Sequence, residues 1–345
     1  MIKIAFDVMG SDNGADVAIE AGLKFLETHQ DLELIFVGDE KEINQAIDKH
    51  LPKYKKVNKD SFSIFKTTEV IDSHGSILDI RRKKDASIVR TLEMVRDKKV
   101  DAMLTAGSSA AFIAGAQTII GNIPGVKRSA FMPTIPSTVD GKVLQLLDAG
   151  ANLDNTAEEL LQFSQMASVY ATAVNGVEKP MVGLMNIGEE ASKGKELQKS
   201  AYKLLEADKT INFYGNIEPR EILNGVVDIM VTDGFTGNIA LKTAEGVARS
   251  VGHELKSQVK KHWWRKLAVL QMIPTFKAIG KKFNYKNHAG AILIGINGIV
   301  FKSHGSSDLQ SFGATLRMTY DAVQNQVLDK LTIGMKGYII DGNEK

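Results

Sequence analysis

The chain has 345 residues, of which 43% are hydrophobic and 24% charged, and its formal net charge is +2. This composition is typical of a soluble globular protein with ample core, and the near-neutral charge argues against a general nucleic-acid-binding protein. There is no cysteine, which excludes disulfides, thiolate metal sites and a cysteine nucleophile. We expect a cytoplasmic protein, because the N-terminus turns acidic at Asp7, too early for a signal peptide, and no apolar run is long enough to span a membrane.

Predicted strands and helices alternate along the chain. The strands are expected within residues 2–6, 32–39, 62–65, 100–109, 143–152, 181–188, 226–231 and 292–299. The helices are expected at residues 15–26, from 41, at 87–96, at 110–120 and up to about 331. This alternation indicates right-handed βαβ crossovers and an α/β fold, with helices on both faces of a mainly parallel sheet. We expect residues 1–345 to form a single catalytic domain.

Glycine and small polar residues follow at least five of the predicted strands. These strand ends lie around Asp7, Gly107, Asp148, Gly188 and Asp233. The carboxyl ends of parallel strands share one edge of a sheet, and ligands bind at that edge. The sequence therefore predicts one extended anion site along it.

The strand end at residues 226–238 carries the strongest local signal. An apolar run there stops at the turn Asp233-Gly234-Phe235-Thr236-Gly237-Asn238, and a helical pattern begins at once. A helix N-terminus presents backbone N–H groups to an anion, and Gly234 and Gly237 would let the backbone approach a ligand. The alternative is an ordinary turn between a strand and a helix, with Asn238 as a helix cap.

Lys193 is the lysine that stands in a glycine-containing loop directly after a predicted strand, within Asn186-Ile187-Gly188-Glu189-Glu190-Ala191-Ser192-Lys193-Gly194. It is either a surface lysine or a cation that binds phosphate. The seven histidines are scattered, and the chain has no Gly-x-Ser-x-Gly motif, no Walker lysine and no dinucleotide fingerprint. We therefore predict no metal and no cofactor.

Several motifs together resemble the bacterial phosphate acyltransferases over nearly the whole chain. They are Asp7-x-Met9-Gly10-x-Asp12-Asn13, Gly121-x-Ile123-Pro124-Gly125, Asp140-Gly141-Lys142, Leu147-Asp148-x-Gly150-Ala151-Asn152, Asn186-Ile187-Gly188, Lys193-Gly194, Val231-Thr232-Asp233-Gly234-Phe235-Thr236-Gly237-Asn238 and His304-Gly305-Ser306-Ser307-Asp308. The block that contains Thr236-Gly237-Asn238 is the most specific. Ser108-Ser109 departs from the Asn-Thr usual in the family, which preserves hydrogen bonding but changes its reach.

The resemblance implies a three-layer α/β/α fold like those of phosphotransacetylases and isopropylmalate dehydrogenase, a homodimer, and no cofactor. It implies transfer of a fatty acyl group from acyl carrier protein to inorganic phosphate for phospholipid synthesis. It also implies attachment to the inner face of the cell membrane, beside the downstream acyl-phosphate:glycerol-3-phosphate acyltransferase. Lys193 and Asn238 match the family's leading catalytic candidates. The candidates for binding substrate or phosphate are Asp7, Gly10, Asp12, Gly107, Ser108, Ser109, Asp148, Asn152, Asn186, Gly188, Asp233, Gly234, Thr236, Gly237 and His304.

The residue chemistry suits direct attack of phosphate on a thioester. A thiolate with a conjugate-acid pKa near 8.5 leaves without much acid help, and phosphate is largely dianionic at pH 7. The protein then has to hold the anion, orient it and stabilise an oxyanion. The competing hypotheses are a small-acyl phosphotransacetylase that uses coenzyme A, an oxidoreductase of the related dehydrogenase fold, and a non-catalytic scaffold.

The sequence predicts a helical arm at residues 240–288. Apolar residues spaced three and four apart from Leu241 to Val259 form a narrow seam suited to a partner helix. Residues 256–286 contain nine Lys or Arg and no Asp or Glu. Pro274 should interrupt any helix there and leave a hydrophobic tip between two helical arms. We predict dimerisation through the seam and docking on an anionic membrane surface, with a purely protein interface as the alternative. The predicted membrane contacts are Trp263, Trp264, Leu267, Leu270, Met272 and Ile273.

Overall fold

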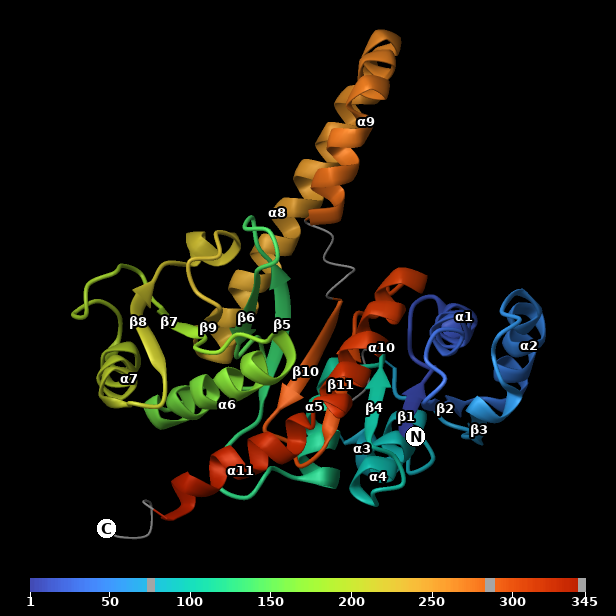
Figure 1. Ribbon diagram of the computed structural model, residues 1–345, viewed down its shortest axis with the longest axis horizontal. Helices are drawn as coiled ribbons and strands as arrows, with labels where there is room; N and C mark the ends of the chain where they lie inside the picture. The colour runs from blue at the N-terminus through green and yellow to red at the C-terminus, as the bar shows by residue number, and fades with distance from the viewer. Residues whose placement is uncertain (73–77, 283–288, 341–345) are drawn as a thin grey trace.

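A mixed sheet organises the fold of the computed structural model, which describes residues 1–72, 78–282 and 289–340 (Figure 1). The strands are β1 (Ile2–Asp7), β2 (Leu32–Gly38), β3 (Phe62–Lys66), β4 (Ala102–Thr105), β5 (Ala130–Pro136), β6 (Val143–Leu147), β7 (Met181–Met185), β8 (Asn212–Ile217), β9 (Ile229–Val231), β10 (Gly290–Ile294) and β11 (Ile299–Ser303). Their order in the sheet is β3-β2-β1-β4-β11-β10-β5-β6-β9-β7-β8.

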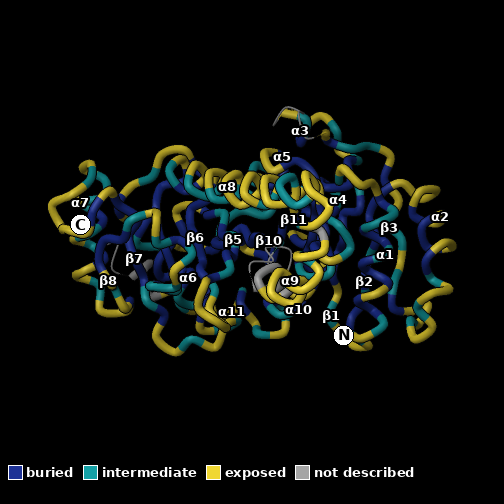
Figure 2. Tube along the Cα trace, turned by 90° about the horizontal axis from the view of Figure 1, so that it is seen from above, coloured by how far each residue is buried: buried dark blue, intermediate teal, exposed yellow. Residues whose placement is uncertain are grey.

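The helices connect most of these strands and cover the sheet. The α-helices are α1 (Gly14–Leu26), α2 (Glu40–His50), α3 (Asp79–Arg82), α4 (Ser87–Arg96), α5 (Ser109–Gly115), α6 (Ala157–Asn175), α7 (Glu196–Ala207), α8 (Gly234–Lys261), α9 (Trp263–Lys282), α10 (Leu309–Gln324) and α11 (Val327–Ile340). Shorter helical turns are η1 (Leu51–Lys53), η2 (Lys59–Ser61), η3 (Ala116–Ile120) and η4 (Pro219–Leu223). Seen from above, α4, α5 and α8 lie on one face of the sheet, and α6, α10 and α11 lie on the other (Figure 2). The predicted α/β/α layering is confirmed.

Two blocks of parallel strands run in opposite directions. The first block contains β3, β2, β1, β4 and β11, and the second contains β6, β9, β7 and β8. The pairs β11–β10, β10–β5 and β5–β6 between the blocks are antiparallel. The prediction that all five polar strand ends share one edge is therefore wrong. The ends near Asp7 and Gly107 point one way, and those near Asp148, Gly188 and Asp233 point the other.

The reversal comes from the central strands, which the sequence pattern did not resolve. The sequence predicted one strand at residues 292–299. The structure instead has the antiparallel pair β10 and β11, with a turn that begins at Gly295. Gly295 has a φ of +96°, in the region that favours glycine. β5, which pairs with both β10 and β6, was not predicted, nor was β8 at the edge of the sheet.

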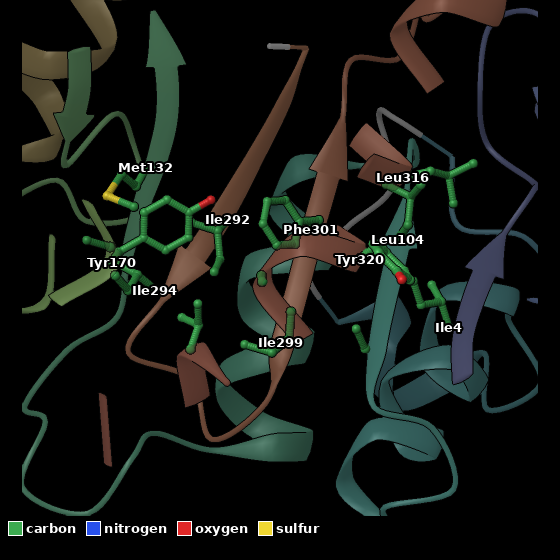
Figure 3. Close-up of a cluster of buried hydrophobic side chains, with 14 of the residues drawn as sticks. Ile4, Leu104, Met132, Tyr170, Ile292, Ile294, Ile299, Phe301, Leu316 and Tyr320 are labelled. Atoms are coloured by element: carbon green, nitrogen blue, oxygen red, sulfur yellow. The ribbon is translucent and has the colours of Figure 1, made fainter. Parts of the chain in front are cut away.

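Apolar side chains fill both sides of the sheet. Ile292, Phe301 and Tyr170 belong to the core between the sheet and the α6, α10, α11 layer, where they are at most 2% exposed (Figure 3). Met103 and Val300 face the opposite layer, with α4 and α5. Because successive residues of a strand point to opposite faces, this alternation in β4 and β11 determines which polar residues face α5 and α8.

The long helix α8 leaves the sheet and forms a protruding arm together with α9 (Figure 1). The two helices run side by side, and the chain reverses at His262, whose backbone is extended. Pro274 lies inside α9, so the prediction that it interrupts the helix and leaves the tip there is wrong. No described helix is long and apolar enough to cross a bilayer.

Candidate active site

The loop after β6 is built around the buried carboxylate of Asp148. Its Oδ1 accepts hydrogen bonds from the backbone N–H groups of Phe131 at 2.9 Å, Gly150 at 3.1 Å and Ala151 at 2.9 Å. Its Oδ2 accepts from the backbone N–H and the Nδ2 of Asn152, both at 2.8 Å. Burial raises the pKa of Asp148, and these hydrogen bonds oppose that shift. Asp148 therefore shapes the loop, and its acceptor capacity is used within the protein.

The N-terminus of α8 packs directly on this loop. A Cβ at Gly237 would lie 1.9 Å from the carbonyl oxygen of Asp148, and one at Gly234 would lie 2.1 Å from that of Asn152. No side chain fits at such distances. The close backbone approach expected at these two glycines is therefore an approach to the protein's own loop.

Asp233 caps α8. Its Oδ1 accepts from the backbone N–H of Thr236 at 2.8 Å, and its Oδ2 accepts from the hydroxyl of Thr236 at 2.8 Å. Asn238 is the fifth residue of the helix and does not cap it. Its side chain lies over Gly150, where a Cβ would be 3.3 Å from the Asn238 Cγ. The capping alternative for Asn238 is thus wrong, and its amide is positioned by the 148–152 loop.

Lys193 lies in the loop after β7, at the same end of the second block. Asn186 holds this loop: its Nδ2 donates to the carbonyl oxygen of Lys193 at 3.1 Å, and its Oδ1 accepts from the N–H of Ile187 at 2.8 Å. The stem of Lys193 passes over Gly188, where a Cβ would lie 3.2 Å from the Lys193 Cγ. The side chain is exposed, and its Nζ has no hydrogen-bond or ion-pair partner among the described residues.

The end of β1 carries a second buried acid, Asp7. Its Oδ2 accepts from the hydroxyl of Thr105 at 2.7 Å, and its Oδ1 from the N–H of Met9 at 3.1 Å. Burial raises the pKa of Asp7 to about 6. Nearby, Gly10 has a φ of +74° and approaches Gly107 so closely that a Cβ would lie 3.1 Å from the Gly107 Cα.

The loops after β1, β4 and β11 meet beside Asp7. The N–H of Asp12 donates to the carbonyl oxygen of Gly305 at 2.8 Å, which joins the first loop to the one that contains His304. Ser108 caps α5 by accepting from Ala111 at 3.4 Å, and Ser109 begins that helix. Partial burial and the positive charges of Lys242 and Lys302 lower the pKa of His304.

The structure thus divides the predicted site residues between two clusters. Asp7, Gly10, Asp12, Gly107, Ser108, Ser109 and His304 belong to the first block, and Asp148, Asn152, Asn186, Gly188, Lys193, Asp233, Gly234, Thr236, Gly237 and Asn238 belong to the second. The strand register connects the two clusters. Asp7 of β1 pairs with Thr105 of β4, and Thr105 pairs with Lys302 of β11. Lys302 lies opposite Ala291 of β10, which pairs with Pro133 of β5. Phe131, two residues from Pro133, donates to Asp148.

Helix α8 connects the clusters. Asn238 and Lys242 are one turn apart and share a side of the helix, about 6 Å apart along its axis. Lys242 is near enough to Lys302 and His304 to lower the pKa of both. Lys242 and Lys302 were missed by the sequence analysis. The signal that could have identified Lys302 is its position inside the apolar run of β11.

The described residues include no group of three or more His, Asp or Glu side chains arranged to hold a metal ion. What the site offers is the amide of Asn238, the ammonium group of Lys193 and the cations Lys242 and Lys302 of α8 and β11. Such groups suit anions and developing negative charge. The fold and these groups together define the class as an α/β/α protein with amide and cationic groups at its candidate site.

Comparison with known proteins identifies the family. Residues 2–330 match the model of the fatty acid synthesis protein family. A phosphate acyltransferase of Mesoplasma florum is 54% identical over 331 residues, which cover 96% of this chain and 98% of the relative. The chain therefore belongs to the phosphate acyltransferase family of fatty acid and phospholipid synthesis.

Solved structures confirm the expected fold. The EutD phosphotransacetylase of Staphylococcus aureus aligns with a TM-score of 0.57 at 14% identity, covering 95% of this chain and 94% of that one. A 4-hydroxythreonine-4-phosphate dehydrogenase of Klebsiella pneumoniae aligns with a TM-score of 0.50 at 13% identity, covering 94% of this chain and 98% of that one. At such identities, the likeness concerns the fold alone.

The contact between α8 and the 148–152 loop predicts opposite effects for two glycines of one helix. Gly237→Ala should lower the free energy of unfolding by at least about 2 kcal/mol, because its methyl group would overlap the Asp148 carbonyl. Gly246→Ala is the matched control: no atom lies within 4 Å of its Cβ, and alanine should stabilise the helix by up to about 1 kcal/mol. Urea denaturation of both variants measures the difference. Equal stability would contradict the packing described.

Proposed function

We propose that the protein transfers a fatty acyl group from an acyl carrier protein thioester to inorganic phosphate. The product is an acyl phosphate for the synthesis of phosphatidic acid. The main support for this proposal is that the chain is 54% identical, over 96% of its length, to a phosphate acyltransferase. The anion-binding character of the two clusters is consistent with it.

Direct attack of phosphate on the thioester carbonyl fits the groups available. Phosphate forms the new C–O bond, the carbonyl oxygen carries the transient negative charge, and the carrier thiolate leaves when the C–S bond breaks. We assign Lys193 as a cation that holds the phosphate or this oxyanion, and Asn238 as an amide donor to the same charge. Asp148 and Asp233 act indirectly, because their carboxylates hold the 148–152 loop and the first turn of α8.

A small-acyl phosphotransacetylase that uses coenzyme A is the second candidate, and the fold shared with the EutD phosphotransacetylase supports it. The test is a direct comparison of two thioesters with the same acyl chain. We expect acyl phosphate to form at least about tenfold faster, measured as kcat/KM, from the carrier-protein thioester than from the coenzyme A thioester. The opposite preference would favour the second candidate, and no acyl phosphate from either would contradict both.

Removal of the Lys193 charge should slow turnover. Lys193→Ala should lower kcat by about 10²- to 10³-fold, the size typical for loss of one electrostatic group of an oxyanion site. The fold should persist, because the side chain is exposed. Lys199→Ala, which removes an exposed lysine from nearby α7, is the control and should retain activity. A Lys193→Ala variant as active as the control would make Lys193 an ordinary surface residue.

We further propose that residues 1–345 act as one catalytic domain and that residues 240–288 join two copies and contact the membrane; residues 283–288 of this arm lie outside the described residues. Two features support this. Val251 and Leu255 of the predicted seam are 55% and 52% exposed in the single chain, so a partner helix could cover them. At the reversal of the arm, Trp263 and Trp264 are 73% and 54% exposed beside basic residues. An acyl phosphate formed at such a surface could pass directly to the downstream glycerol-3-phosphate acyltransferase.

All six predicted membrane contacts are exposed on the arm, namely Trp263, Trp264, Leu267, Leu270, Met272 and Ile273. We expect wild type to float with liposomes of anionic lipid and much less with neutral liposomes, because basic residues add about 1 kcal/mol each near an anionic surface. The triple variant Trp264→Ala, Leu267→Glu, Leu270→Glu should stay in solution.

Ile333→Glu serves as the control for this flotation experiment. It also replaces an exposed apolar residue, 70% exposed, but on α11 away from the arm. It should float like wild type. Flotation of the triple variant, or equal binding of wild type to both lipids, would show that the arm is not the anchor.

A further inference from the structure

Lys302 is a buried cation that the proposed mechanism does not use. It lies in β11 between β4 and β10 and is 8% exposed. Its Nζ donates to the carbonyl oxygen of Ser303 at 3.0 Å. Among the described residues, no carboxylate lies within ion-pair distance of this ammonium group. Burying a charged group without a countercharge is unfavourable, so an anion bound beside Lys302 would stabilise its charged form.

The neighbourhood of Lys302 contains Lys242 and His304, and also the acids Asp12 and Glu245. Burial and the positive charge of Lys242 lower the pKa of Lys302 to about 8, while Asp12 opposes the shift. At pH 7 Lys302 therefore still carries its proton most of the time. Lys242 is paired with Glu245 at 2.9 Å, and His304 lies near both lysines. We call Lys302, Lys242 and His304 the Lys302 cluster.

Hydrogen bonds fix the backbone around the Lys302 cluster. The hydroxyls of Ser303 and Ser307 are 2.6 Å apart, and Thr315 donates to Ser303 at 3.1 Å. The Nδ2 of Asn13 donates to the carbonyl oxygen of Ser307 at 2.9 Å. The loop that contains His304 is thus held on two sides. A cluster in a fixed frame can receive an anion without first being reorganised.

We propose that the Lys302 cluster binds a phosphate group. A phosphate has several acceptor oxygens, enough for two ammonium groups and an imidazole, and its charge would balance the buried cation. The inference rests on the proposed function, which supplies two sources of this group: inorganic phosphate, and the phosphodiester of the arm that carries the thioester. Asn238, one helical turn from Lys242, links the cluster to the residues assigned to the reaction.

The test measures phosphate binding and both Michaelis constants on the full chain. Inorganic phosphate is titrated calorimetrically, at constant ionic strength, into wild type, Lys302→Met and Lys242→Ala. Loss of one charge-assisted contact should raise the Kd by about 10- to 100-fold in Lys302→Met, with a smaller rise in Lys242→Ala. Lys242 is exposed, so its variant tests the cluster even if the buried Lys302→Met does not fold. Lys330→Ala, on α11 beyond the opposite face, should leave the Kd unchanged.

The outcomes separate the two sources. A higher Kd and a higher KM for phosphate assign the cluster to inorganic phosphate. An unchanged phosphate Kd with a KM for the carrier thioester raised about tenfold assigns it to the phosphodiester. If every folded variant keeps the wild-type Kd and both KM values, the inference is overturned while the acyltransferase function stands. Absence of acyl phosphate formation by wild type would instead overturn the proposed function.

Discussion

The contact between the start of α8 and the Asp148 loop is the constraint on which most of the candidate site depends. A buried carboxylate that accepts five N–H bonds gives the 148–152 loop one shape. Two glycines let α8 lie directly on that loop, closer than any side chain allows. This contact positions the Asn238 amide, and it sets the direction in which α8 leaves the sheet. The location of Lys242 and the course of the arm both follow from that direction.

The reversal of strand direction places the polar strand ends of the two blocks at opposite edges of the sheet. The register of β11, β10 and β5 determines how far apart these strand ends lie. β11, β10 and β5 stand between two blocks whose carboxyl ends point in opposite directions. Across the sheet, Lys302 is in register with Pro133 of β5 through β10. Pro133 is two residues from Phe131, whose N–H donates to Asp148. Since α5 and α8 lie on the same face (Figure 2), charged groups from both blocks flank one side of the sheet.

The same helix serves the candidate site and the protruding arm. In its first two turns, Ala240 and Leu241 pack against the apolar cluster that includes Leu144 and Leu146 of β6, and its later turns expose apolar residues such as Val251. A single helix therefore connects the candidate site to the surface that we propose for the dimer and the membrane. This arrangement would keep a product with a long apolar chain close to the place where it is needed.

The sequence alone determined the α/β class, the family and many of the elements, because apolar periodicity and short glycine motifs are local properties of the chain, but it missed β5 and β8. It located the strand ends near Asp7, Asp148 and Asp233, each of which the structure confirms as the end of a strand. Tertiary structure alone decided how these ends are arranged, because β5 and the β10–β11 pair reverse the sheet through contacts distant in sequence. It also decided that Gly234 and Gly237 approach a loop of the protein itself, and that Lys302 is buried beside Lys242. Local patterns report which residues are apolar or flexible, whereas the partner of a glycine or a charge depends on packing between segments far apart in the chain.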